Sequence, residues 1–369
     1  MKTNIPERIA ALREAMRQQK VDAYIIPSSD PHLSEYPADR WKSREWISGF
    51  TGSAGTIVVT ADKAGLWTDS RYFLQAASQL EGSGIELYKL ALPETPSITE
   101  FLLHELHAGQ AVGLDGQTYS AAEASALANK LSRKEIKLDT SADLIEGIWK
   151  DRPAVPGNPI FEMPEALSGA SVHEKLDLIN NQLRSEGADC LILAALDEIA
   201  WTFNIRGTDV TYNPVVVSYA FVSEDESVLF IKPEKLTAEI TEHLKKEGVT
   251  LAEYSMIQRY LSRLPENSRV FVDMNKTNVS LYDAIPGSCT IVEGISPANH
   301  LKSIKNETEI KGFQNAVVKD GVALTKFYIW LEKQMAEGAQ VTEISAAEKL
   351  TALRAEQPQY IMDLSLIHI

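Results

Sequence analysis

The chain has 369 residues, enough for roughly two or three domains, and 44% of them are hydrophobic and 24% charged, as in globular proteins with sizeable cores. Its formal net charge of −15 argues against nucleic acid as a partner, because binding to phosphates depends on clustered Lys and Arg. Residues 1–10 lack the apolar stretch of a secretory signal, and no apolar run reaches the about 20 residues that cross a bilayer. We therefore predict a cytoplasmic protein that does not bind membranes.

The chain contains two cysteines, Cys190 and Cys289. Each lies in an apolar segment, at the start of residues 190–195 and within residues 288–292. Both are predicted to be small core residues rather than partners in a disulfide.

A helix followed by a strand occurs twice. Residues 8–16 carry apolar side chains at positions 9, 12 and 16 and precede a strand candidate at 21–26. Residues 175–183 carry them at positions 176, 179 and 183 and precede a second candidate at 188–193. The spacing matches the helical period in both places, and Asp22 and Asp189 precede their strands by the same interval. This repetition predicts an α/β fold with two tandem domains and mixed sheets.

The same order continues after the first strands. Residues 46–52 resemble residues 201–207, since each segment opens with Trp and closes with Gly. Each is followed by two strand candidates, which strengthens the interpretation as a duplication. Between the copies, residues 151–159 contain three prolines and a glycine and are predicted to form a linker.

We place the first domain at 1–152, the second at 153–300 and the start of a third at 301–369. Asn306 with Glu309 forms a predicted capping box at the start of a helix. A second helix is expected from 342 to about 356, and residues 360–362 are predicted to open a strand. The first helix carries an apolar stripe formed by Ile310, Phe313, Val317, Leu324, Tyr328 and Leu331.

Two short motifs invite a functional interpretation that their spacing does not support. Residues 49–55 are rich in glycine but lack the spacing of a phosphate-binding loop, so we interpret them as a tight strand-to-strand connection. His104 and His107 share a helix face, but they end a helix, where histidine commonly faces the helix dipole. Neither motif predicts a ligand.

Asp69 and Arg71 follow a strand candidate at 64–68. Asp69 is expected to cap the following helix, whereas Arg71 opposes the helix dipole and needs another reason to be there. The reason is either a buried ion pair with a carboxylate or contact with a substrate or a neighbouring subunit.

The run from Asp197 to Gly207 follows the apolar strand candidate at 190–195. We expect Asp197 and Glu198 to cap a helix and to form an interface salt bridge, and Arg206 and Asp209 are natural partners within the same segment. Trp201 is expected in a core or an interface. Asp197, Glu198, Trp201 and Arg206 are thus predicted to be structural or interface residues.

No catalytic or metal-binding constellation is visible in the sequence. A G-x-S-x-G motif and a cysteine cluster are both absent, and no histidine has acids at ligand spacing. The residues themselves therefore predict neither a catalytic residue nor a metal ligand in this chain.

The motifs nevertheless resemble, in order and over nearly the whole chain, those of the three-domain Xaa-Pro aminopeptidases (aminopeptidase P). The matching segments are residues 27–36, 48–56, 67–75, 148–153, 196–214 and 341–347. Prolidase and creatinase are similar but usually carry one N-terminal domain, so the duplication favours aminopeptidase P.

The resemblance implies two creatinase-N-terminal-like domains followed by a pita-bread catalytic domain. In the family this last domain binds two divalent metal ions, commonly manganese, which activate water to release the first residue of peptides with penultimate proline. The resemblance also implies that Arg71 contacts the substrate, that the partners are proline-containing peptides, and that the N-terminal domains take part in homodimerisation.

The family's metal ligands and catalytic histidines lie beyond Ser365, and the ending Leu366–Ile369 departs from the family pattern. We therefore expect a C-terminally truncated chain that binds no metal and is inactive, with Leu366–Ile369 as a foreign or misread tail. The alternatives are a non-catalytic binding module with a creatinase fold, like that of histone chaperones, a prolidase-like dipeptidase, and a free-standing protein of two lobes.

Overall fold

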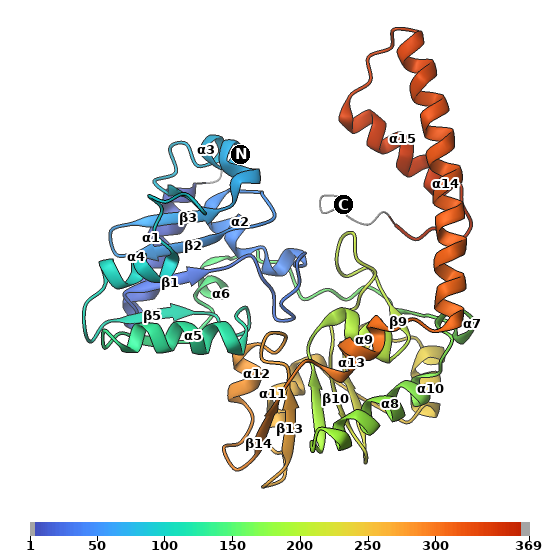
Figure 1. Cartoon of the computed structure of the whole chain (residues 1–369). Coiled ribbons are helices and arrows are strands. Elements are labelled where there is room, and N and C mark those ends of the chain that lie inside the picture. The colour runs from blue at the N-terminus through green and yellow to red at the C-terminus, as the bar shows by residue number, and fades with distance from the viewer. Residues whose placement is uncertain (1–3, 363–369) are drawn as a thin grey trace.

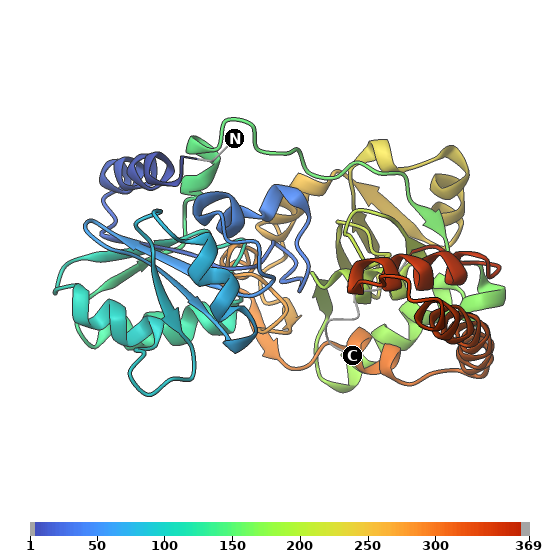
Figure 2. The same ribbon diagram turned by 90° about the horizontal axis from the view of Figure 1, so that it is seen from above.

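The computed structural model describes residues 4–362, which form two α/β lobes and a helical stalk (Figure 1). Lobe one contains residues 5–148 and lobe two residues 160–303, and the stalk consists of the two helices that follow. Seen from above, the lobes lie side by side and the stalk stands over lobe two (Figure 2). Residues 151–159 form neither helix nor strand, which confirms the predicted linker.

Lobe one is built on a six-stranded sheet with the order β4-β3-β2-β1-β5-β6. Its strands are β1 (Ala23–Ile26), β2 (Thr56–Thr60), β3 (Ala64–Thr68), β4 (Glu86–Lys89), β5 (Ala111–Leu114) and β6 (Lys137–Asp139). Its helices are α1 (Ile5–Gln19), η1 (Asp39–Trp41), α2 (Ser43–Ser48), η2 (Ser70–Tyr72), α3 (Phe73–Gln79), α4 (Ile98–Glu105), α5 (Ala121–Ser132) and α6 (Leu144–Ile148).

Lobe two has a six-stranded sheet with the order β12-β11-β10-β8-β13-β14 and a two-stranded sheet of β7 and β9. Its strands are β7 (Phe161–Glu162), β8 (Cys190–Leu193), β9 (Ile205–Arg206), β10 (Tyr219–Ser223), β11 (Ser227–Phe230), β12 (Val249–Ala252), β13 (Arg269–Val272) and β14 (Thr290–Glu293). Its helices are α7 (Glu165–Ser168), α8 (Val172–Ser185), α9 (Leu196–Thr202), η3 (Pro233–Lys235), α10 (Ala238–Lys246), η4 (Tyr254–Met256), α11 (Ile257–Leu261), α12 (Val279–Asp283) and α13 (Pro297–Ser303).

Helices cover both faces of each sheet. Because successive residues of a strand point to opposite sides, each strand contributes side chains to both cores. In lobe one, Tyr24 and Ile26 of β1 face α1, α2 and α6, while Ala23 and Ile25 face α4 and α5. In lobe two, one face packs on α8, α9 and α10 and the other on α11 and α12. The prediction of an α/β fold with two tandem lobes and mixed sheets is confirmed.

The two sheets share one topology. In each, the central strand, β1 or β8, pairs antiparallel with the next strand of the meander and parallel with the strand after the crossover, β5 or β13. Asp22 and Asp189 make equivalent hydrogen bonds in the two lobes. The carboxylate of Asp22 accepts the backbone N–H of Ala111 (2.9 Å), and that of Asp189 accepts the backbone N–H of Arg269 (2.8 Å).

The lobes are joined along a seam formed by residues 30–34, 116–122 and 274–280. Backbone hydrogen bonds cross it in both directions, so the seam extends the backbone pairing of the lobes rather than relying on side chains alone. These bonds run from Ala121 N to Thr277 O (2.9 Å), Ala122 N to Met274 O (3.0 Å), Val279 N to Tyr119 O (2.9 Å) and Ser280 N to Gly116 O (3.1 Å).

His32 inserts from lobe one into lobe two at this seam and is 2% exposed. Its Nδ1 lies 2.9 Å from the carbonyl oxygen of Ala194, which can only accept, so Nδ1 carries the proton and Nε2 accepts the hydroxyl of Tyr254 at 2.9 Å. Burial lowers the pKa of His32 to about 3, so the ring is neutral at physiological pH.

Asp30 stabilises the backbone conformation of the segment that carries His32. Its Oδ1 accepts the backbone N–H groups of His32 and Ser34, each at 2.9 Å. The whole residue is buried, and Oδ2 makes no hydrogen bond within the described residues. Burial therefore raises the pKa of Asp30 to about 6, because the charged form loses its hydration.

The stalk consists of α14 (Glu307–Ala336) and α15 (Glu343–Ala355), packed against each other. The predicted capping box of Asn306 and Glu309 is confirmed, and α15 has the predicted extent with Thr342 as N-cap. The prediction of a strand at 360–362 is wrong, because these residues form no backbone pairing with any described strand. Leu366–Ile369 lie outside the described residues.

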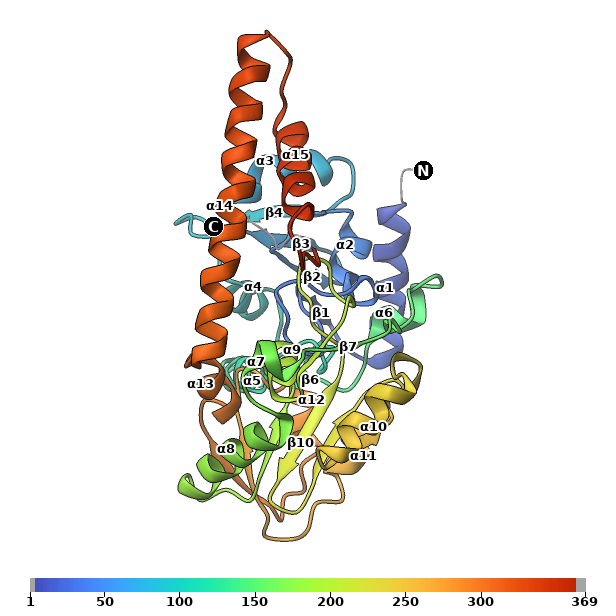
Figure 3. The ribbon, with the colours of Figure 1, turned by 90° about the vertical axis from the view of Figure 1, so that its right-hand side faces the viewer.

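The stalk projects from lobe two with much of its apolar surface uncovered (Figure 3). Phe313 is 58% exposed, Val317 70% and Tyr328 59%. The expected boundary between residues 300 and 301 falls inside α13, which packs on α8 and α9. Among residues 4–362, the structure has no helix that is both long and apolar enough to span a membrane.

Replacing Asp30 by Asn tests the buried acid at the seam. The pKa of Asp30 is raised from 3.8 to about 6, so the folded protein binds more protons than the unfolded chain between these values. This group thus favours folding at acid pH, and its contribution is lost as the pH rises through about 6. Asp30→Asn keeps the Oδ1 acceptor and removes the charge.

We expect Asp30→Asn to gain stability relative to the wild-type chain by on the order of 2 kcal/mol between about pH 4 and pH 6.5. Urea unfolding at several pH values measures the difference in the free energy of unfolding between the two proteins. The pKa of His32 is lowered, so its pH dependence is opposite to that of Asp30, but it is present in both proteins and cancels in the difference. A difference that does not change with pH would contradict the assignment.

Candidate functional site

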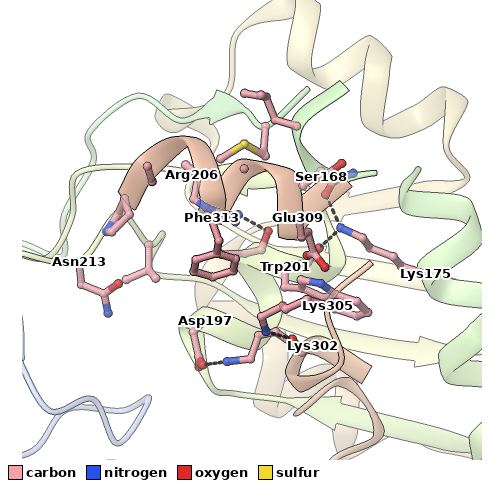
Figure 4. Close-up of a pocket in the computed structure, with 18 residues that line it drawn as sticks. Ser168, Lys175, Asp197, Trp201, Arg206, Asn213, Lys302, Lys305, Glu309 and Phe313 are labelled. Atoms are coloured by element: carbon pink, nitrogen blue, oxygen red, sulfur yellow. Dashed lines mark hydrogen bonds and ion pairs between the residues drawn. The ribbon is translucent and has the colours of Figure 1, made fainter. Parts of the chain in front are cut away.

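A pocket of about 470 Å³ opens where the first turns of α14 pass over lobe two (Figure 4). One wall comes from α8, α9 and the strand β9, and the other from α14 and the segment that follows α13. The side chains that decide its chemistry are Lys175, Asp197, Trp201, Arg206, Lys305 and Glu309.

The wall of lobe two is shaped by the turn that ends α9. Asn204 adopts a left-handed conformation (φ 50°), which turns the chain from the helix into β9. The turn leaves Arg206 beside the end of α9, where its guanidinium donates to the carbonyl oxygens of Ala200 (2.7 Å) and Ile205 (2.9 Å). Burial lowers the pKa of Arg206, and the carboxylate of Glu309 opposes that shift.

Lys175 comes from the buried face of α8 and is 2% exposed. Its Nζ donates to the carbonyl oxygen of Trp201 (2.9 Å) and to Oδ1 of Asn204 (2.5 Å), and lies 4.8 Å from the centre of the Trp201 ring. Burial lowers the pKa of Lys175 to about 8, against the stabilising charge of Glu309.

The wall of α14 is held by its capping box. Oδ1 of Asn306 accepts the N–H of Glu309, and the carboxylate of Glu309 accepts the N–H of Asn306, each at 2.9 Å. Asn306 also donates through Nδ2 to the carbonyl oxygen of Ser168 at 2.8 Å, which fastens the helix to α7. Phe313 follows one turn later, on the same side as the pocket (Figure 4).

The expected capping by Asp197 and Glu198 is wrong, whereas Asp197 does form an ion pair, with Lys302 rather than with a residue of its own segment. The N-cap residue of α9 is Ala195, which has no side chain that can cap. Both acids lie in the first turn of the helix, where a negative charge interacts favourably with the helix dipole. Asp197 pairs with Lys302, and Glu198, 1% exposed, accepts Nδ2 of Asn299 at 3.1 Å. Burial raises the pKa of Glu198.

Both partners come from α13, about 100 residues later in the chain. Asp209 likewise pairs not with its neighbours but with Lys235, and this ion pair is buried on both sides. Trp201 is partly buried against the core of lobe two. That Asp197, Glu198, Trp201 and Arg206 serve structure or an interface stays a prediction.

Arg71 lies on lobe one, away from this pocket. Its guanidinium holds the carboxylate of Asp69 through two hydrogen bonds of 2.9 Å, and Asp69 also caps η2, as predicted. The pair is exposed rather than buried, because the side chain of Arg71 is 44% accessible. Substrate binding by Arg71 stays a prediction.

A second pocket, of about 330 Å³, is lined by both lobes. It includes Ser53, whose hydroxyl lies 2.6 Å from that of Tyr72, the residue after Arg71. Tyr212 lines it from lobe two in a left-handed conformation (φ 65°). The glycine-rich run 49–55 borders this pocket and connects α2 to β2, so the expected strand-to-strand connection is wrong.

Within residues 4–362, no group of three or more His, Cys, Asp or Glu side chains is placed to hold a metal ion. The described residues therefore do not fit the two divalent ions that the family resemblance implies, and no chemical step is derived through them. The absence of a metal site from the chain as a whole stays a prediction.

Three cationic residues of the pocket were not predicted from the sequence, namely Lys175, Lys302 and Lys305. Lys175 gave the one available signal, because it lies four residues before Ile179 on the apolar face of its helix. A lysine on a buried stripe needs polar partners from elsewhere in the fold.

The buried pair of Lys235 and Asp209 gives a stability prediction. Asp209 Oδ2 accepts both the ammonium of Lys235 and the N–H of Val217 (2.7 Å). Lys235→Met leaves a buried carboxylate without its cation and is expected to lower the free energy of unfolding by about 3–5 kcal/mol.

The double variant Lys235→Met with Asp209→Asn removes both charges and keeps the acceptor for Val217. It is expected to recover at least about 1–2 kcal/mol of that loss in urea unfolding. Equal stability of the two variants would show that the charge of Asp209 costs nothing when it is unpaired.

Two family models match the chain, both described as the creatinase/prolidase N-terminal domain, at residues 8–148 and 151–309. A probable Xaa-Pro aminopeptidase P of Coprinopsis cinerea is 38% identical over 95% of this chain and 58% of its own length. The Xaa-Pro aminopeptidase ApepP of Drosophila melanogaster is 36% identical over 98% of this chain and 60% of its own length.

The crystal structure of X-prolyl aminopeptidase from Caenorhabditis elegans, described as a cytosolic enzyme with a di-nuclear active site, superposes with a TM-score of 0.91 at 30% identity. It covers 98% of this chain and 61% of the worm chain, so this chain spans about 60% of the length of such relatives. By its paired creatinase/prolidase domains and its likeness to these enzymes, the chain belongs to the Xaa-Pro aminopeptidase family.

Proposed function

We propose that this chain supplies the two N-terminal lobes and the first helices of an enzyme that releases the N-terminal residue from peptides with a penultimate proline. The observation that carries the proposal is the TM-score of 0.91 over 98% of the chain with the worm aminopeptidase. The shared topology of the two sheets adds support, because two successive creatinase-type lobes are what the family resemblance predicts. The binding-module and dipeptidase alternatives are not favoured, since these relatives are named aminopeptidases.

In this proposal residues 301–369 begin the catalytic domain. The uncovered apolar side chains of α14 support the assignment, because a 30-residue helix with Val317 70% exposed needs further chain against it. Two divalent metal ions, proposed to be manganese, would be held by residues outside the described part. The isolated chain would bind no metal and catalyse no hydrolysis.

The lobes would shape access to that centre. Arg71 is proposed to contact the substrate, because its bidentate pair with Asp69 fixes an exposed guanidinium. The next residue, Tyr72, contacts Ser53 of the pocket that both lobes line. Leu74, 90% exposed and three residues further on, fits the proposed homodimer contact of the N-terminal lobes. A cytosolic location is proposed because the worm aminopeptidase is described as a cytosolic enzyme.

The first test compares two proteins on one Xaa-Pro peptide with added Mn²⁺. One is this chain, and the other is residues 1–362 joined to the C-terminal part of the Drosophila relative. We expect the chain to release no N-terminal residue and the chimaera to release it in a metal-dependent manner. Metal-dependent release by the chain alone would contradict its inactivity, and a folded, metal-loaded chimaera without activity would contradict the proposed function.

A second test replaces Arg71 by Ala in the active chimaera. Loss of one charge-assisted contact is expected to raise KM by about tenfold and to change kcat by less than about twofold. Arg17→Ala is the matched control, because Arg17 is an exposed lobe-one arginine paired with a nearby acid, Glu14. An unchanged KM in Arg71→Ala would remove Arg71 from the substrate site.

A further inference from the structure

The pocket beneath α14 has a charge opposite to that of the molecule. The chain carries a formal net charge of −15, yet four cationic side chains line this pocket against two acidic ones. The cations are Lys175, Arg206, Lys302 and Lys305, and the acids are Asp197 and Glu309. Such a concentration of one sign in a concave site attracts ligands of the other sign.

Most of these cations are not neutralised by ion pairs. Lys302 is paired with Asp197, but within residues 4–362 no carboxylate forms an ion pair with Lys175, Arg206 or Lys305. The hydrogen bonds of these three run to carbonyl oxygens and to the amide oxygen of Asn204. Such bonds satisfy donors without cancelling charge, and a desolvated cation gains from a nearby anion.

Part of the wall that α14 contributes to the pocket is apolar. Phe313 is 58% exposed and points into the pocket between the cationic side chains (Figure 4). Ala316 lines the pocket one turn further along α14. The indole of Trp201 and the side chain of Met163 add apolar surface from lobe two. A ligand that carried only charge would leave this surface exposed to water.

We propose that this pocket binds a carboxylate joined to an apolar side chain, as at the C-terminal end of a peptide. The carboxylate lies toward Arg206 and Lys305, and the apolar side chain packs on Phe313. The volume of about 470 Å³ accommodates such a group. The site is formed by residues of lobe two, of the segment after α13 and of α14, none of which is proposed to take part in the hydrolysis.

The test measures binding to the whole chain by calorimetric titration with three probes. These are N-acetyl-phenylalanine, its carboxamide N-acetyl-phenylalaninamide, and inorganic phosphate. We expect N-acetyl-phenylalanine to bind at least about tenfold more tightly than either of the others, because only this probe offers both groups. Equal binding of the carboxamide would overturn the proposal, and equal or tighter binding of phosphate would show a plain anion site and overturn it as well.

Variants locate the site. Lys305→Gln is expected to weaken N-acetyl-phenylalanine binding by about three- to tenfold, whereas Lys246→Gln, an exposed lysine on α10 with the same charge change, leaves it unchanged. Phe313→Ala is expected to weaken binding of this probe and to leave phosphate binding unaltered. Circular dichroism melting checks that each variant is folded. Equal loss in Lys246→Gln, or no loss in both pocket variants, would refute the assignment.

Discussion

The arrangement of the molecule depends on the seam between its lobes. Backbone hydrogen bonds between residues 116–122 and 274–280 join the two lobes by main-chain pairing, which mutation of surface side chains does not remove. The inserted ring of His32 then closes the seam from the other side, with both ring nitrogens occupied. Because the linker 151–159 has no regular structure, the position of one lobe on the other follows from this seam and from the packing of Ala38 and Trp41 on lobe two. The pocket lined by both lobes follows in turn.

Duplication explains why the two lobes can share one plan despite little sequence likeness. The positions that recur are those where the sheet topology leaves a specific group to satisfy. Asp22 and Asp189 each accept the first N–H of the strand that joins the central strand in parallel. The carboxylate accepts the first backbone N–H of that strand, which the parallel pairing with the central strand would otherwise leave without an acceptor. Both candidate pockets are lined by parts of the two segments that resemble each other, residues 201–207 in one pocket and residues 46–52 in the other.

The parts of the fold that could be predicted from sequence are those set by local physics. The capping box at Asn306 and Glu309, the extent of α15 and the helical stripes depend on neighbours within a few residues. The expected partners of Asp197 and Glu198 were wrong because the actual ones arrive from α13, brought in by the folding of a whole lobe. The strand expected at 360–362 failed for a similar reason, since a strand exists only with a partner. The pocket beneath α14 was not foreseen, because its walls meet only when the chain is folded.

The attachment of α14 has a mechanical consequence. The N-cap residue Asn306 packs directly on Gly169, where an added Cβ would approach its Oδ1 to 2.5 Å. The N-terminus of α14 therefore leaves no room for a side chain at position 169. From this N-terminus the 30 residues of α14 extend roughly 45 Å. The helix is therefore a lever arm, and a tilt of about 10° at its base moves its far end by about 8 Å. A methyl group at position 169 would displace the side chain of Asn306, the N-cap of α14, and would thereby change the direction of the helix and of α15, which packs on it.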